Sequence, residues 1–156
     1  MPDSSTKKVC VVLPTYNEAG NIKTAIEQIF YNQKYLGGYV LSVLVVDDNS
    51  PDNTQAIVKE LMAVYPQLNQ ISGDKKGLGD AYKRGIDFAL KNLDADLVVQ
   101  MDADGQHDPS LIAGFIKLTG QQDVNIGSRF IEGGSTPDFS LRRLVLSKTA
   151  NFLVRY

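Results

Sequence analysis

Short apolar runs alternate with segments of helical periodicity along most of this chain. The runs are rich in β-branched residues and end at polar, Gly or Pro residues, which predicts strands at 9–13, 40–46, 69–72, 97–101 and 124–127. Between them, helices are expected at 22–30, from the turn at 50–52 to just before Pro66, at 77–90 and at 109–118. Because strands joined by helix-length connections pair in parallel, the sequence predicts an α/β fold with a mainly parallel sheet.

The spacing of apolar residues predicts which face of each helix is buried. These faces carry Ile22, Ile26, Ile29 and Phe30 in the first helix, Ile57, Leu61, Met62 and Tyr65 in the second, and Tyr82, Ile86 and Leu90 in the third. The chain has 156 residues, of which 43% are hydrophobic, so it is long enough for one domain with a proper core.

Charge and cysteine content limit the functions open to the chain. Its net charge of −2 lacks the basic excess of a general nucleic-acid binder. The only cysteine, Cys10, lies within the run at 9–13, which predicts a buried thiol, no disulfide framework and a reducing, cytoplasmic compartment. Residues 1–7 form a polar tail rather than a signal peptide, and no apolar stretch approaches the roughly 20 residues of a membrane-spanning helix.

Two carboxylates one residue apart, Asp102 and Asp104, follow the apolar run at 97–101 in a loop closed by Gly105 and Pro109. In an extended backbone the two side chains point the same way, and like charges held that close repel unless a cation lies between them. Mg²⁺ and Mn²⁺ prefer oxygen ligands and suit such a place. The alternative interpretation is an acidic surface turn. Metal ligation by the neighbouring His107 is not expected, because these cations prefer oxygen.

Polar residues also follow the other predicted strands. The first is followed by Pro14-Thr15-Tyr16-Asn17-Glu18, the second by Asp47-Asp48-Asn49-Ser50, and the last by Gly127-Ser128-Arg129. In open α/β sheets, ligands bind beyond the carboxyl ends of the strands, near the point where strand order reverses. The sequence therefore predicts one metal-dependent ligand site along this edge.

These motifs, in this order, resemble those of the family-2 glycosyltransferases, and more narrowly those of the dolichol-phosphate (polyprenol-phosphate) mannosyltransferase branch. The resemblance spans roughly residues 8–150 and includes Asp47-Asp48-Asn49-Ser50-Pro51-Asp52-Asn53-Thr54 and Gly77-Leu78-Gly79-Asp80-Ala81-Tyr82. It implies the three-layer nucleotide-diphospho-sugar transferase fold (GT-A, Rossmann-like), in agreement with the α/β prediction. Members of this family continue beyond the length of this chain, which implies a missing C-terminal part or a partner subunit.

The implied activity is that of an inverting hexosyltransferase. It would move mannose from GDP-mannose to a polyprenyl (dolichyl) phosphate, with Mg²⁺ or Mn²⁺ holding the diphosphate. Three alternatives stay open: a UDP-sugar donor, a hydroxyl acceptor, and a non-catalytic nucleotide-sugar-binding module.

The resemblance also implies a role for individual residues. Nucleotide contacts are implied at the ends of the first two strands, for Pro14, Tyr16, Glu18, Val45 and Asp47. Diphosphate contacts are implied for Asp102, Ala103, Asp104 and Arg129, metal ligation for Asp102, Asp104 and Gln106, and catalysis for Asp104 and Arg129. A forked guanidinium such as that of Arg129 suits phosphate. Lys75, Lys76 and Lys83 are expected to be solvated.

The last segment, 141–156, predicts a helix with Leu141, Val145, Phe152 and Tyr156 in one stripe and Lys148 and Arg155 along its flank. Such a helix fits a peripheral position at the cytoplasmic membrane face, or it covers the sheet as an ordinary helix. Arg142, Arg143, Ser147 and Lys148 are the candidates for contact with the acceptor phosphate. The predicted organisation is a tail at 1–7, a GT-A domain at 8–131, a mobile loop at 132–140 and the acceptor-side helix.

Overall fold

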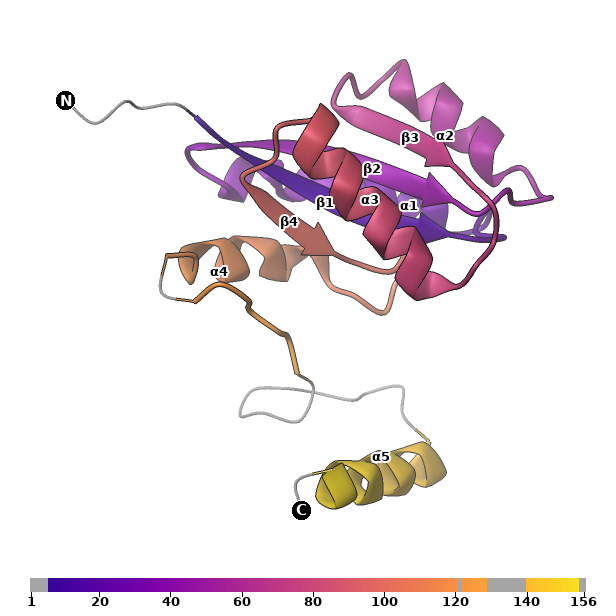
Figure 1. Ribbon diagram of the computed structural model, residues 1–156, viewed down its shortest axis with the longest axis vertical. Helices are drawn as coiled ribbons and strands as arrows, with labels where there is room; N and C mark the ends of the chain where they lie inside the picture. The colour runs from indigo at the N-terminus through magenta and orange to yellow at the C-terminus, as the bar shows by residue number, and fades with distance from the viewer. Residues whose placement is uncertain (1–5, 121, 129–139, 155–156) are drawn as a thin grey trace. The chain divides into compact units, whose positions relative to one another are not determined.

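The computed structural model describes residues 6–120, 122–128 and 140–154 of the chain, which forms two compact units, Met1–Thr119 and Gly120–Tyr156. The first unit contains a parallel sheet of β1 (Lys7–Thr15), β2 (Tyr39–Asp47), β3 (Leu68–Ser72) and β4 (Leu97–Gln100), in the order β3-β2-β1-β4 (Figure 1). Strand order reverses at β1, because β2 and β3 extend the sheet on one side and β4 on the other. The carboxyl ends of β1 and β4 therefore flank the reversal point at which ligands bind in such sheets.

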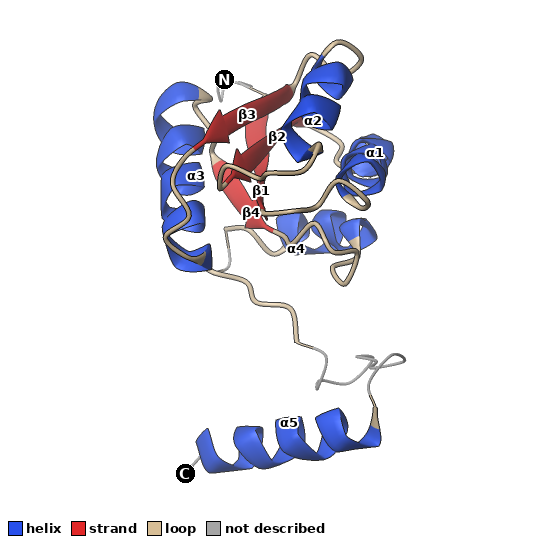
Figure 2. Cartoon of the chain, turned by 90° about the vertical axis from the view of Figure 1, so that its right-hand side faces the viewer, coloured by secondary structure: helices blue, strands red, loops and turns tan. Residues whose placement is uncertain are grey.

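Helices cover both faces of the sheet, so the predicted three-layer α/β architecture is confirmed (Figure 2). One face carries α1 (Ile22–Asn32), α2 (Thr54–Met62) and α4 (Ile112–Lys117), and the other carries α3 (Leu78–Asn92). Short 3₁₀ turns at Gln33–Tyr35 and Pro109–Leu111 follow α1 and precede α4. Cys10 is fully buried on the α3 side, as predicted, and burial raises the pKa of its thiol.

The predicted buried face is right for α1 and partly wrong for α2. All of the residues predicted for α1 are buried. In α2, Met62 is 38% exposed, whereas Val58, which the prediction did not include, is fully buried. The reason is that α2 begins at the fully buried Thr54, whose hydroxyl group is bonded to the preceding loops. This anchor turns the face containing Thr54, Val58 and Leu61 toward the sheet, since residues three and four apart share a helix face.

Helix α3 packs on the sheet mainly through small residues, and of the predicted Tyr82, Ile86 and Leu90 only the partly buried Tyr82 packs against this core. Ala81, Gly85 and Ala89 are its buried residues, while Leu90 is 50% exposed. The two layers approach so closely that a β-carbon at position 85 would clash with Val12 and lie 2.8 Å from Val46 Cγ2.

Gly85→Ala is expected to lower the free energy of unfolding by about 1–3 kcal/mol, because the added methyl group overpacks the contact between α3 and the sheet. Gly79→Ala in the same helix is the matched control, since no atom lies within 4 Å of its β-carbon. Ala is favoured over Gly in a helix by up to about 1 kcal/mol, so the control should be at least as stable as the parent chain. Urea unfolding measures both variants, and equal stability would contradict the close packing.

One strand prediction is confirmed and one is wrong. The predicted strand at 97–101 is β4, which ends at Gln100, and its residues are partly buried or exposed, because among the described strands β4 pairs with β1 alone and forms an edge. Residues 124–127 form no strand, and Val124 and Ile126 are 73% and 83% exposed. A β-rich segment without a neighbouring strand has no partner for its backbone N–H and C=O groups, so its sequence preference alone does not produce one.

The second unit contains α5 (Leu141–Val154). Its exposed apolar residues lie in two rows, one of Leu141, Val145 and Phe152 and one of Leu146 and Leu153, so its apolar surface is wider than the single predicted stripe. Within the described ranges, no helix has the length and apolar character needed to span a bilayer. Residues 132–139 of the predicted loop, Arg155 and Tyr156 lie outside the described residues.

Candidate active site

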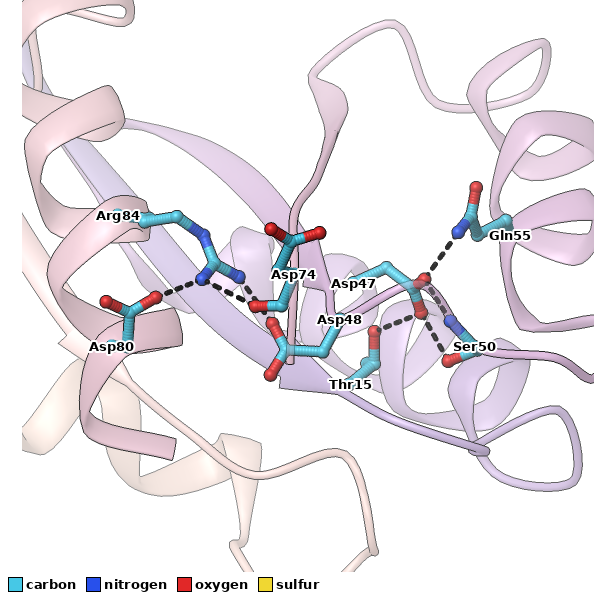
Figure 3. Close-up of polar contacts among 8 residues, drawn as sticks. All are labelled: Thr15, Asp47, Asp48, Ser50, Gln55, Asp74, Asp80 and Arg84. Atoms are coloured by element: carbon cyan, nitrogen blue, oxygen red, sulfur yellow. Dashed lines mark hydrogen bonds and ion pairs between the residues drawn. The ribbon is translucent and has the colours of Figure 1, made fainter. Parts of the chain in front are cut away.

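Asp47 ends β2, and its side chain is completely buried. Its carboxylate accepts hydrogen bonds from Thr15 Oγ1 at 3.1 Å, from the backbone N and the Oγ of Ser50 at 2.8 and 2.6 Å, and from Gln55 Nε2 at 2.6 Å (Figure 3). Thr15 ends the neighbouring strand β1, and Gln55 lies in the first turn of α2. These four donors occupy the lone pairs of the carboxylate, so Asp47 fastens the loop after β2 to the sheet and to α2.

The loop after β1 is joined to the loop after β2 by backbone N–H groups that donate to side chains. Asn17 donates to Ser50 Oγ at 3.0 Å, Glu18 to Thr54 Oγ1 at 2.9 Å, and Ala19 to Asp52 Oδ2 at 3.1 Å. Hydrogen bonding from Thr54 lowers the pKa of Asp52. The polar residues of the segment 47–54 therefore build the edge of the sheet, and they hold the segment that carries Tyr16 in place.

An ion-pair network joins the end of β2 to α3 (Figure 3). The Arg84 guanidinium donates to Asp48, to Asp80 in its own helix, and to the carbonyl oxygen of Asp74 at 3.4 Å. Burial disfavours the charged form of Arg84, but bonding to Asp48 and Asp80 outweighs it and raises the Arg84 pKa. A β-carbon at Gly73 would lie 2.9 Å from Arg84 Nε, so the glycine leaves room for this group.

Tyr16 follows β1 and exposes part of its ring to solvent. Lys75 is exposed, as predicted, and its ammonium also lies 3.3 Å from the centre of this ring in a cation–π contact. Pro14 and Glu18 in the same segment are partly buried. Val45, predicted to line the nucleotide pocket, is fully buried in the core, because it lies in a central strand with its side chain on the face covered by α1 and α2.

Asp102 and Asp104, the two carboxylates of the D-x-D motif Asp102-Ala103-Asp104, face outward beyond the end of β4. Met101 and Ala103 are buried, whereas Asp102 is half-buried and Asp104 is exposed, which is the alternation predicted for an extended backbone. Asp104 Oδ1 accepts a hydrogen bond from the Gln106 N–H at 2.9 Å within the loop. The backbone N–H of Asp102 donates to His107 Nδ1 at 3.0 Å, so His107 supports this loop.

Tyr82 connects α3 to the D-x-D motif. Its hydroxyl donates to Asp102 Oδ1 at 2.8 Å. Burial, the hydrogen bond to Asp102 and the nearby charges of Asp102 and Asp104 raise the pKa of Tyr82, so its hydroxyl stays protonated and serves as a donor. Helix α3 thus contacts the loop after β2 through Arg84 and the loop after β4 through Tyr82, on both sides of β1.

The oxygen atoms of Asp102 and Asp104 fit a hard divalent cation. No group of three or more His, Cys, Asp or Glu residues suited to metal binding forms among the described residues. A pair of carboxylates is nevertheless what Mg²⁺ commonly takes from a protein, because phosphate oxygens and water complete its coordination. The donor set therefore suits a cation bound together with a diphosphate.

Several predicted site residues belong to the second unit or lie outside the described residues. Arg129 lies outside the described residues. Arg142 and Lys148 are exposed on α5 and Ser147 is half-buried there, while the side chain of Arg143 in the same helix is not described. Their roles stay predictions.

Asp48, Arg84 and Tyr82 are the site residues that sequence reasoning missed. The spacing of Asp80 and Arg84, four apart on a helix, does signal an ion pair. Nothing in the sequence signals that Arg84 also reaches Asp48 or that Tyr82 reaches Asp102, since both contacts depend on where α3 crosses the sheet.

A parallel α/β sheet with outward-facing carboxylates at its reversal point agrees with the GT-A-like fold that the sequence motifs imply. The chain belongs to glycosyl transferase family 2, whose sequence profile matches residues 10–155. It is 36% identical over 154 residues to the polyprenol monophosphomannose synthase of Mycolicibacterium smegmatis, covering 97% of this chain and 56% of that protein. It is 37% identical over 144 residues to the dolichol-phosphate mannosyltransferase of Pyrococcus furiosus, covering 92% of this chain and 39% of that protein.

A solved structure supports the same fold. The mannosyltransferase of Pyrobaculum calidifontis, in complex with GDP-Man and Mn²⁺, matches with a TM-score of 0.51 and 30% identity over 67% of this chain and 30% of that one. The chain thus spans about half or less of each of these proteins. The predicted family and fold are confirmed.

Proposed function

We propose that this chain is the donor-binding part of a polyprenyl-phosphate mannosyltransferase that uses GDP-mannose and Mg²⁺ or Mn²⁺. The observation that carries the proposal is the outward-facing pair Asp102 and Asp104 beside the reversal point of the sheet. The similarity to a polyprenol monophosphomannose synthase and a dolichol-phosphate mannosyltransferase, together with a structural neighbour bound to GDP-Man and Mn²⁺, favours this donor and this acceptor.

In the proposed mechanism Asp102, Asp104 and Gln106 would hold the cation, which would supply positive charge to stabilise the departing nucleoside diphosphate. Tyr16 and Glu18 bind the nucleoside, and Arg129 binds phosphate. Asp47 acts on the donor through the loop that it braces rather than by direct contact, because four donors already occupy its carboxylate.

The acceptor in this proposal is an anionic phosphate, whose oxygen attacks the anomeric carbon from the face opposite the diphosphate. An anion needs no general base, so no catalytic carboxylate is required for deprotonation. Arg142 and Lys148 on α5 are exposed cations suited to the acceptor phosphate or to anionic headgroups at the cytoplasmic membrane face.

A thermal-unfolding panel tests the donor. GDP-mannose with Mn²⁺ should raise the unfolding midpoint more than UDP-glucose with Mn²⁺, and GDP-mannose in EDTA should have little effect. A larger shift of the unfolding midpoint with UDP-glucose would contradict GDP-mannose as the donor and favour a UDP-sugar instead. Transfer of mannose to a short-chain polyprenyl phosphate then tests the reaction, and donor binding without transfer would favour a binding module completed by further chain.

A further inference from the structure

Tyr82 holds one of the two D-x-D carboxylates from outside the loop. Its ring packs against the core between α3 and the sheet, and its hydroxyl reaches Asp102 Oδ1 at 2.8 Å. On the other side of the same carboxylate, His107 Nε2 lies 3.7 Å from Asp102 Oδ2. The tyrosine is fixed at its base by a helix of 15 residues, so the position of its hydroxyl is set by the fold and not by the loop.

The two carboxylates are held by different means. Asp104 receives its hydrogen bond from Gln106 N–H two residues along the same loop. Asp102, although half-exposed, is connected across 20 positions of sequence to α3. A half-exposed aspartate at a strand end has several accessible rotamers, and a fixed donor to one oxygen selects among them.

We infer that Tyr82 is a positioning residue that orients the Asp102 carboxylate for binding of the cation and diphosphate, an inference that rests on the proposed function. Groups that hydrogen-bond to metal ligands set the orientation of those ligands, and their loss commonly reduces metal affinity or activity about 10–100-fold. The inference gives α3 a part in donor binding, because the same helix that packs on the sheet also sets the geometry of the D-x-D motif.

Tyr82→Phe removes the hydroxyl and keeps the ring. In the 156-residue chain, Mn²⁺ titrated in the presence of GDP should bind about tenfold more weakly to this variant than to the parent. Its unfolding midpoint without ligands should stay close to that of the parent, because the packed ring remains. Tyr65→Phe is the matched control, since that tyrosine stacks on Phe30 in a different part of the core, and its Mn²⁺ affinity should be unchanged.

Parent-like Mn²⁺ affinity in Tyr82→Phe would overturn this inference and leave the proposed function standing. Absence of Mn²⁺-dependent GDP binding in the parent chain would overturn both. If the Phe variant does not fold, Tyr82→Leu, which keeps an apolar side chain on the half-buried face, is expected to show the same tenfold loss. Equal loss of GDP affinity in Mn²⁺ and in EDTA would indicate a purely structural role and would also overturn the inference.

Discussion

Asp104→Asn is expected to abolish the stabilisation that Mn²⁺ and GDP-mannose together give the chain. The variant keeps the size of the side chain but removes the charge of the more exposed D-x-D carboxylate, which lies at the edge of the loop and not in the core. A ligand at about 100 times its Kd stabilises by about 2.7 kcal/mol, which corresponds to roughly 5–10 °C for a domain of this size. Thermal unfolding with and without the ligands measures this shift.

The midpoint of Asp104→Asn without ligands should equal that of the parent chain, which separates loss of binding from loss of folding. Asp87→Asn on α3 is the matched control, because its exposed carboxylate forms an ion pair with Lys91 at 3.5 Å and lies on the same helix as Tyr82. This control should keep the full ligand response. A full response of Asp104→Asn to Mn²⁺ plus GDP-mannose would show that Asp104 does not bind the metal.

The order of elements and the edge that carries the site follow from simple patterns. Apolar runs and helical spacing locate β1, β2 and α1, because these elements are buried on their expected faces. The parallel sheet then places the end of β2 and the loop after β4 at one edge, on either side of β1. The shared direction of the Asp102 and Asp104 side chains could be predicted from the alternation of side chains along an extended backbone alone.

The packing of α3 could not be predicted from hydrophobicity. Its buried positions are Ala81, Gly85 and Ala89, which have small or no side chains and therefore give little apolar signal. This face of α3 is buried because the helix lies very close to the sheet, and only small side chains fit between them. Tyr82 and Arg84 lie just beside that face, so the same error concealed their contacts with Asp102 and Asp48.

The role of Asp47 marks a second limit of sequence reasoning. Strand order places this residue at the ligand edge, but it does not say whether the carboxylate points to a ligand or to its own loop. The answer depends on Thr15, Ser50 and Gln55, three residues from a strand, a loop and a helix that supply four donors and converge only in the folded chain.

Asp47→Ala is therefore expected to lower the free energy of unfolding by about 3 kcal/mol or more. The substitution removes the common acceptor of four hydrogen bonds and leaves buried donors unsatisfied, each at a cost of about 1–3 kcal/mol that relaxation of the loop partly relieves. Urea unfolding followed by circular dichroism gives the free energy, and the thermal midpoint should fall by on the order of 10 °C.

Thr15→Val provides the graded comparison, since it removes one of the donors and leaves the Asp47 carboxylate with the other three. Its expected cost is about 1 kcal/mol, the usual net contribution of one hydrogen bond. If Asp47→Ala were no more destabilising than Thr15→Val and instead lost GDP affinity, then Asp47 would contact the nucleotide directly. A large loss of stability places the carboxylate in the framework instead, because a group whose lone pairs are all engaged inside the protein has none left to offer a ligand.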